Sequence, residues 1–390
     1  MSFSRNAVSY AVLVGLFSWV TPMRADNITG YLYASDYGAQ ALDRFSYNFD
    51  TVSKTISNWQ PAGAGGSTTS ALFINSNIKE GLQGTANDII VVNSGGNSLS
   101  RYTLAGALIG NIPILNADNS AHTLNSVGNV AITSDGKFMY APESGAGKID
   151  KIDLATGKIV AQVAFAGAHD VFIRPDGTLY AAAYTNSNVG SAGIWKFDAN
   201  LGSKSQLITS GDNGLSRPTG MSLSSTGTLY IQSNVFPTNS LASGANTVFE
   251  YAIDPGTGAA TFSAKTQSPK LQFDFGTDLG PDGNLYIAAL GSGQTHATFG
   301  ALPNYTNGVY AFDTTARTTS LAIAGYNVGG TGTPSYGFDS PKYLQFGTNF
   351  ITAQDAGYQS ETPEPGSLAL LVVLLSGGAG LSARRRRRTA

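Results

Sequence analysis

The chain has 390 residues, of which 42% are hydrophobic and only 12% are charged, and its formal net charge is -2. This balance excludes the basic surface of a nucleic-acid-binding domain, and the absence of cysteine excludes disulfides and thiolate chemistry. The 47 glycines, 18 tyrosines and 19 phenylalanines favour many short strands joined by tight turns over helices.

The chain begins with a pattern typical of a secretory signal peptide. Arg5 precedes an apolar run from Ala7 to Val20, and Ala25 is a suitable last residue for the segment that is removed. A buried helix is the alternative, but the sequence becomes polar and strand-like immediately after Asp26. We therefore predict a signal peptide over residues 1–25 and one large β domain over residues 26–361 that is exported from the cytoplasm.

Four segments of the β domain share one pattern, in which a short apolar strand, a turn containing Gly and a second strand follow one another. This pattern predicts β-hairpins, and the segments are Asn129–Ala141, Asp170–Ala181, Gly220–Ile231 and Thr277–Ile287. A third strand ending in Asp follows each hairpin. We interpret these aspartates as turn residues whose carboxylates accept backbone N–H bonds; they are Asp153, Asp198, Asp254 and Asp313.

The hairpins recur at intervals of roughly 40 to 55 residues, which is the period of a four-stranded propeller blade. Weaker units flank them: the first, at Tyr31–Ala34, lacks a leading strand, and the last, at Tyr343–Phe346 and Phe350–Ala353, lacks trailing strands. These two ends can share one blade and close the ring. The sequence predicts an all-β propeller of six, or else seven, four-stranded blades, with a β-sandwich pair or a parallel β-helix as alternatives.

The repeat, with Pro-Asp-Gly-x-Leu-Tyr as its core, resembles the NHL and YVTN class of propeller repeats over most of residues 27–359. That class is shared by binding modules, lactonases and lyases. The resemblance therefore implies a β-propeller fold without implying one function.

The chain ends with three ordered features within residues 362–390. A Pro363-Glu364-Pro365 motif precedes an apolar stretch over residues 366–383, and an arginine cluster follows it, made of Arg384, Arg385, Arg386, Arg387 and Arg388. The apolar stretch approaches the roughly 20 residues that a membrane-spanning helix requires, and positive charge after it stays on the cytoplasmic side.

This order of features resembles the PEP-CTERM sorting signal of Gram-negative bacteria that make extracellular polysaccharide. The resemblance implies transient anchoring in the inner membrane, cleavage near Pro363–Pro365 by an exosortase, and delivery to the cell surface or the extracellular matrix. A simple tail anchor, held by the same transmembrane helix, is the alternative.

Residues just before each innermost strand of a propeller meet at one mouth of the central channel. In this chain they are Asn129, His169, Asp170, Arg217, Thr219, Thr277, Asp278, Asp339 and Lys342. His169 and Asp170 are the candidate catalytic residues, because an imidazole and a carboxylate can act as acid or base. Since adjacent strand residues point to opposite faces, a structural or surface role for His169 is the competing interpretation.

An oxygen-rich propeller mouth can also bind a divalent cation such as Ca²⁺. The resemblance to lactonases implies ligands from several blades, and the candidates are Glu143, Asn234, Asp278 and Asp88. We predict no zinc motif, because His122 and His296 lie in loop-like sequence without a partner at regular spacing.

Two functions remain open. The first is a surface or matrix module that binds extracellular polysaccharide or surface proteins, with Tyr184, Phe236 and Tyr305 next to amide side chains that suit sugar rings. The second is a lactonase-like hydrolase or a lyase with a divalent metal at the channel mouth. The sequence favours the binding module over the enzyme.

Overall fold

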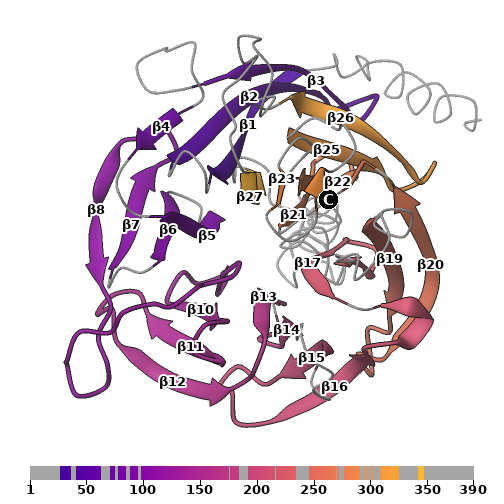
Figure 1. Ribbon diagram of the computed structural model, residues 1–390. Helices are drawn as coiled ribbons and strands as arrows, with labels where there is room; N and C mark the ends of the chain where they lie inside the picture. Colours follow the sequence, from indigo (N-terminus) through magenta and orange to yellow (C-terminus); the bar gives the residue numbers. More distant parts are fainter. Residues whose placement is uncertain are drawn as a thin grey trace, which may run out of the picture.

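A computed structural model of the chain describes residues 27–36, 41–62, 71–74, 78–84, 88–94, 98–174, 176–183, 192–215, 217–233, 246–268, 270–271, 276–289, 295–296, 300–301, 308–324 and 341–346. The strands form six sheets of at least four strands, arranged as the blades of a propeller around a central axis (Figure 1). In the described residues, the all-β fold with six four-stranded blades therefore agrees with the sequence prediction of six blades.

The first three blades, with strands in order from the innermost to the outermost, contain the N-terminal half of the domain and the closing strand. Blade 1 contains β27 (Pro341–Phe346), β1 (Asn27–Asp36), β2 (Ala41–Asp50) and β3 (Thr55–Pro61), with β4 (Ala71–Ile74) also paired to β2. Blade 2 contains β5 (Ile78–Gly84), β6 (Asp88–Ser94), β7 (Ser98–Thr103) and β8 (Leu108–Pro113). Blade 3 contains β9 (Ala131–Ile132), β10 (Phe138–Glu143), β11 (Lys148–Asp153) and β12 (Ile159–Ala164).

The other three blades follow the same plan. Blade 4 contains β13 (Ala168–Ile173), β14 (Leu179–Ala183), β15 (Gly193–Phe197) and β16 (Lys204–Thr209), and a short 3-10 helix, η2 (Asp212–Gly214), follows it. Blade 5 contains β17 (Pro218–Leu223), β18 (Thr228–Ser233), β19 (Asn246–Ile253) and β20 (Ala260–Ser268). Blade 6 contains β21 (Thr277–Leu279), β22 (Leu285–Ala289), β25 (Gly308–Asp313) and β26 (Thr318–Ala324), with a separate hairpin of β23 (Thr295–His296) and β24 (Gly300–Ala301) between β22 and β25.

The two ends of the domain close the ring. Strand β27, from the C-terminal part of the chain, pairs antiparallel with β1 and places Phe346 opposite Leu32. The N-terminal unit thus receives its missing innermost strand from the last unit. This confirms the expected shared blade, while Phe350–Ala353 lies outside the described residues.

The hydrophobic core lies between neighbouring blades. One cluster joins Phe172 and Tyr180 of blade 4 to Met221, Leu229 and Phe249 of blade 5. The tyrosine of each Leu-Tyr or Met-Tyr step in the repeat is at least nine-tenths buried, which explains why the repeat retains it; these residues are Tyr140, Tyr180, Tyr230 and Tyr286. Each blade is therefore stabilised mainly by the face that it buries against the next.

Carboxylates hold the turns between the third and fourth strands. The Oδ1 atom of Asp254 accepts hydrogen bonds from the backbone N–H of Gly256 at 3.0 Å and of Thr257 at 2.6 Å. The same arrangement occurs at Asp153, Asp198 and Asp313. The predicted turn role of these four aspartates is confirmed.

The antiparallel order of strands gives the propeller two distinct faces. On one face, which we name the crossover face, each outermost strand leads into the innermost strand of the next blade and each second strand turns into the third. The Asp-containing turns lie on the opposite face.

Among the described residues no helix is long and apolar enough to cross a membrane. The predicted signal peptide (1–25) and sorting signal (362–390) lie outside those residues.

Candidate functional site

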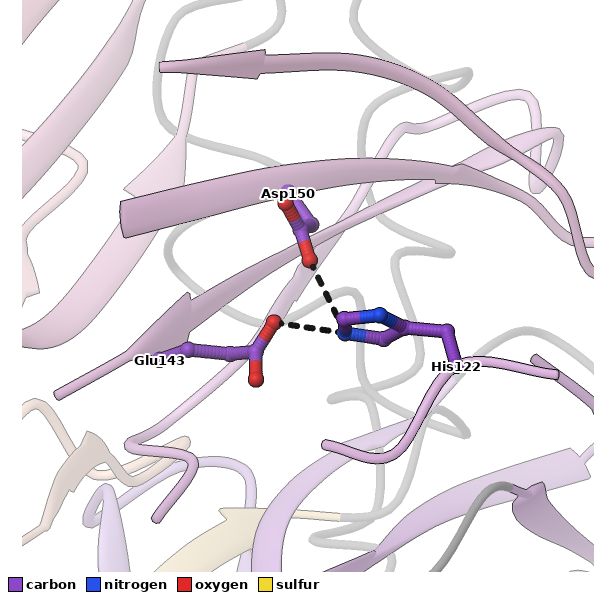
Figure 2. A group of neighbouring side chains, drawn as sticks. All are labelled: His122, Glu143 and Asp150. Atoms are coloured by element: carbon purple, nitrogen blue, oxygen red, sulfur yellow. Dashed lines mark hydrogen bonds and ion pairs between the residues drawn. The ribbon is translucent and has the colours of Figure 1, made fainter. Parts of the chain in front are cut away.

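Four ionisable side chains gather at the crossover face of blade 3, and we name them the His122 cluster: His122, Glu143, Lys148 and Asp150. Glu143 ends β10 and lies directly opposite Lys148, the first residue of β11. Asp150 is two residues further along β11 and so points to the same side of the sheet as Lys148. His122 comes from the segment between β8 and β9, and one edge of its ring faces both carboxylates (Figure 2).

The contacts within the cluster are short. His122 Nε2 lies 3.0 Å from Glu143 Oε1 and 3.5 Å from Asp150 Oδ2. Lys148 Nζ lies 3.2 Å from Glu143 Oε1 and 3.0 Å from Asp150 Oδ2. Two nitrogen groups therefore face the same pair of carboxylate oxygens.

Local backbone structure fixes these positions. Gly147, with φ at 65°, adopts the left-handed conformation that the tight turn between Glu143 and Lys148 requires, and its N–H donates to the Glu143 carbonyl at 2.8 Å. The N–H of Asn125 donates to Glu143 Oε2 at 2.7 Å. The segment that carries His122 is thus held against the end of β10 by the same carboxylate that its imidazole contacts.

The pKa values of the two carboxyl groups are shifted in opposite directions. Both side chains are wholly buried, at 0% exposure, whereas His122 and Lys148 are 14% and 19% exposed. Burial and the closeness of Glu143 raise the pKa of Asp150 to about 7. Burial also opposes ionisation of Glu143, but its contacts with Asp150, the Asn125 N–H, His122 and Lys148 lower its pKa below the ordinary value.

The donor set fits a divalent cation. The ligand atoms of His122, Glu143 and Asp150 all lie within 4.8 Å of one another. Zinc ligands at about 2.0–2.1 Å in tetrahedral geometry stand about 3.3 Å apart, which is close to the 3.0 and 3.5 Å observed from Nε2 to the two carboxylates.

The donor atoms of the cluster also indicate which cation it prefers. One imidazole with two carboxylates suits Zn²⁺ or Mn²⁺, whereas Ca²⁺ takes six to eight oxygen ligands. The donor set therefore favours a transition metal over the Ca²⁺ considered from the sequence.

Several of the predicted channel-mouth residues do meet. Asn129, Thr277 and Asp278 line a small cavity in the channel together with Val171, Met221 and Gln345. Asp278 Oδ2 accepts the N–H of Phe346 at 2.7 Å, and so ties blade 6 to the closing strand β27. The predicted metal ligands Glu143 and Asp278 therefore belong to different groups, the first to the His122 cluster and the second to the channel.

The structure places the two candidate catalytic residues against the next blade. His169 is 6% exposed, and its Nδ1 lies 3.1 Å from the carbonyl oxygen of Thr219. Asp170 is 1% exposed, and its Oδ2 accepts the N–H of Met221 at 2.5 Å. A surface position for His169 is wrong, because both side chains are enclosed between blades 4 and 5, where they join the two blades.

The remaining predicted site residues divide into two groups. Asp88 is paired with Arg101, whose Nε donates to Asp88 Oδ2 at 2.7 Å, and the N–H of Arg217 donates to Ser233 Oγ at 3.2 Å. The other group lies outside the described residues or has no described side chain: Asn234, Asp339, Lys342, Tyr184, Phe236, Tyr305, Pro363, Glu364, Pro365 and Arg384–Arg388.

Sequence reasoning identified only Glu143 among the members of the His122 cluster. The hairpin register contained a usable signal, because a turn after Glu143 places Lys148 opposite it and Asp150 on the same side. His122 gave no such signal. It reaches the site from a segment without regular structure, where spacing along the chain does not predict position.

Comparison by sequence matches the chain to no protein family and to no curated protein. Among solved structures, a chain of the nidogen/laminin complex is similar with a TM-score of 0.52 and 14% identity, over 82% of this chain and 98% of that one. A candidate 6-phosphogluconolactonase from Bacteroides uniformis gives a TM-score of 0.47 and 12% identity, over 82% and 99%. A protein from Lactobacillus plantarum gives the same values. At these identities the likeness establishes the propeller fold alone.

Proposed function

We propose that this chain is an exported propeller hydrolase that opens lactones or related esters with a divalent cation held by His122, Glu143 and Asp150. The observation that carries the proposal is the meeting of one imidazole and two buried carboxylates, all within 4.8 Å, at the crossover face of blade 3. Three protein ligands leave a coordination position open, which is characteristic of catalytic rather than structural sites.

In this proposal the cation, the two carboxylates and Lys148 have different roles. When bound, a divalent cation supplies Lewis-acid polarisation of a carbonyl group and lowers the pKa of water. Glu143 and Asp150 provide the negative charge that holds it. The ammonium group of Lys148, which is partly exposed beside them, can stabilise negative charge that develops on a substrate carbonyl oxygen.

The charge of the cluster favours a carboxylic ester over a phosphoester. Phosphoryl-transfer sites surround a multiply charged group with several cations, whereas this cluster offers one ammonium group besides the cation. A lactone or ester carbonyl gains only a single negative charge when it is attacked. One cationic side chain next to the cation is sufficient for it.

Hydrolysis of glucono-1,5-lactone and of simple esters by the mature exported protein tests this function. We expect activity that a chelator removes and that Zn²⁺ or Mn²⁺ restores, and we expect Glu143→Gln to lower kcat/KM by about 100-fold or more. Glu250→Gln is the matched control, because Glu250 is also a buried glutamate with a cationic partner, Arg317, at 2.8 Å. Activity that is equal in the two variants, or that no chelator affects, would contradict the proposal.

A second candidate function is a binding or structural module of the cell surface or matrix, processed by an exosortase. The observation that favours it is the order of Pro363-Glu364-Pro365, the apolar stretch and the arginine cluster at the C-terminus. Export and processing are compatible with either function. Replacing Glu364 with Ala is expected to leave the full-length chain in the inner membrane, and mass spectrometry of the mature protein measures this. An unchanged mature mass would remove the sorting assignment.

A further inference from the structure

Lys148 occupies the position that a cation in the His122 cluster would need. Its Nζ approaches Glu143 Oε1 at 3.2 Å and Asp150 Oδ2 at 3.0 Å. His122 Nε2 faces these same two oxygens. A cation that binds both oxygens and the imidazole cannot share them with an ammonium group at hydrogen-bonding distance, because like charges so close repel strongly.

The balance of charge favours exchange of Lys148 for a divalent ion. When both carboxyl groups are ionised, they carry two negative charges, and Lys148 supplies one positive charge. Elsewhere in the described structure, the buried carboxylates of Asp88 and Glu250 each face one guanidinium group, from Arg101 and Arg317. When both of its carboxyl groups are ionised, the His122 cluster therefore carries a surplus of negative charge that one lysine does not neutralise, and buried charge without full compensation is costly.

Of the groups involved, Lys148 is the one that can move. Both carboxylates are wholly buried, and Glu143 Oε2 is also fixed by the Asn125 N–H at 2.7 Å. Lys148 is 19% exposed and begins its strand at the crossover face. A lysine side chain has a flexible four-carbon stem, so its ammonium group can turn towards water while the backbone stays in place.

We propose that Lys148 is a built-in counter-cation: it neutralises Glu143 and Asp150 when no metal is bound, and it must leave their shared oxygens when a divalent cation enters. Lys148 thereby sets the metal affinity of the site and keeps the blade folded without metal. This inference rests on the metal site of the proposed function.

Calorimetric titration of Mn²⁺ and Zn²⁺ into the mature protein tests it. We expect Lys148→Met to lower the Kd for both ions by about tenfold or more, because the competing charge is removed while the apolar stem is kept. Lys148→Arg retains the charge and is expected not to lower the Kd. Lys137→Met is the matched control, since Lys137 pairs with the exposed Asp135 at 3.0 Å, and this variant is expected to bind both ions as the wild type does.

Thermal melting gives a second measurement on the same variants. In chelator, Lys148→Met leaves two buried carboxylates without a counter-cation and is expected to melt below the wild type; added Mn²⁺ is expected to reverse this and to raise its Tm more than that of the wild type. Lys148→Gln replaces Lys148→Met if the latter does not fold in chelator.

The outcomes separate this inference from the proposed function. An unchanged or weaker affinity in both Lys148→Met and Lys148→Gln overturns the inference and leaves the hydrolase standing. Tighter metal binding in Lys148→Met, together with no hydrolysis by the metal-loaded wild type, overturns the hydrolase and leaves the inference standing. Failure of both variants to fold even in saturating Mn²⁺ also overturns the inference, because the metal is expected to replace the lost ammonium group.

Discussion

At the scale of single residues, Asp170 combines deep burial with an ionisable side chain. Its Oδ2 accepts the Met221 N–H at 2.5 Å, and its residue is 1% exposed. Burial raises the pKa of Asp170 to about 8, although hydrogen bonds from Met221 and Asn129 act in the opposite direction. Between about pH 4 and pH 8, Asp170 is therefore protonated in the folded protein and ionised in the unfolded chain.

This difference predicts how stability depends on pH. Because the folded pKa is raised, the contribution of Asp170 is fully present below the unfolded pKa of about 4 and is lost as pH rises through about 8. We expect the Tm of the wild type to fall between about pH 5 and pH 8 more steeply than that of Asp170→Asn, which cannot ionise. Melting curves recorded across this range in chelator measure the slopes. Parallel slopes would mean that Asp170 does not titrate there.

The candidate site shows which residues a sequence can identify. Glu143 was among the predicted metal ligands because the resemblance to lactonases implies acidic and amide ligands from several blades. Lys148 and Asp150 share its hairpin and could have been found from strand register. His122 could not, since the backbone N–H of Asn125 and the Glu143 carboxylate set its position through contacts distant in sequence.

At the scale of elements, the sequence repeat predicted the fold better than it predicted the candidate site. The predicted hairpin Asn129–Ala141 corresponds to β9 and β10, and the other three hairpins likewise form the two inner strands of blades 4, 5 and 6. Alternation and turn residues are local properties, so they identify such hairpins. The β23 and β24 hairpin was not predicted, because two-residue strands carry no periodic signal.

The seam between blades 3 and 4 depends on a glycine that the repeat does not reveal. A Cβ atom added at Gly128 would overlap the carbonyl oxygen of His169, and that same carbonyl accepts the N–H of Asn129 at 3.0 Å. The segment that leads into β9 approaches β13 this closely only because residue 128 has no side chain.

We therefore predict that Gly128→Ala destabilises the domain by about 3 kcal/mol or more, since the overlapping groups are backbone atoms that cannot rotate away. Gly110→Ala is the control, because a Cβ at Gly110 meets nothing within 4 Å. Urea unfolding of the two variants measures the difference in midpoint. A Gly128→Ala midpoint equal to that of Gly110→Ala would show that the seam opens easily.

At the scale of the whole molecule, stability depends on closing the ring with β27. Leu344 and Phe346 of this strand are 2% and 1% exposed. The Phe346 ring packs 4.9 Å from that of Tyr286 in blade 6 and 5.6 Å from that of Tyr47 in blade 1. The Phe346 N–H donates to Asp278. One strand from the end of the described chain thus joins the first blade to the last, and the predicted sorting signal begins only a short distance after it.

Truncation tests this dependence. A chain ending at Ser340 lacks β27, so the innermost edge of β1 loses its partner and the contact between blades 1 and 6 loses Phe346; an unpaired strand edge promotes association. We expect this form to melt at a much lower temperature than a chain ending at Glu361, which keeps β27 and removes only the predicted sorting signal. We also expect it to form aggregates in size-exclusion chromatography. Equal melting of the two truncated chains would show that the six blades hold together without strand exchange between the termini, and the closing role of β27 would have to be abandoned.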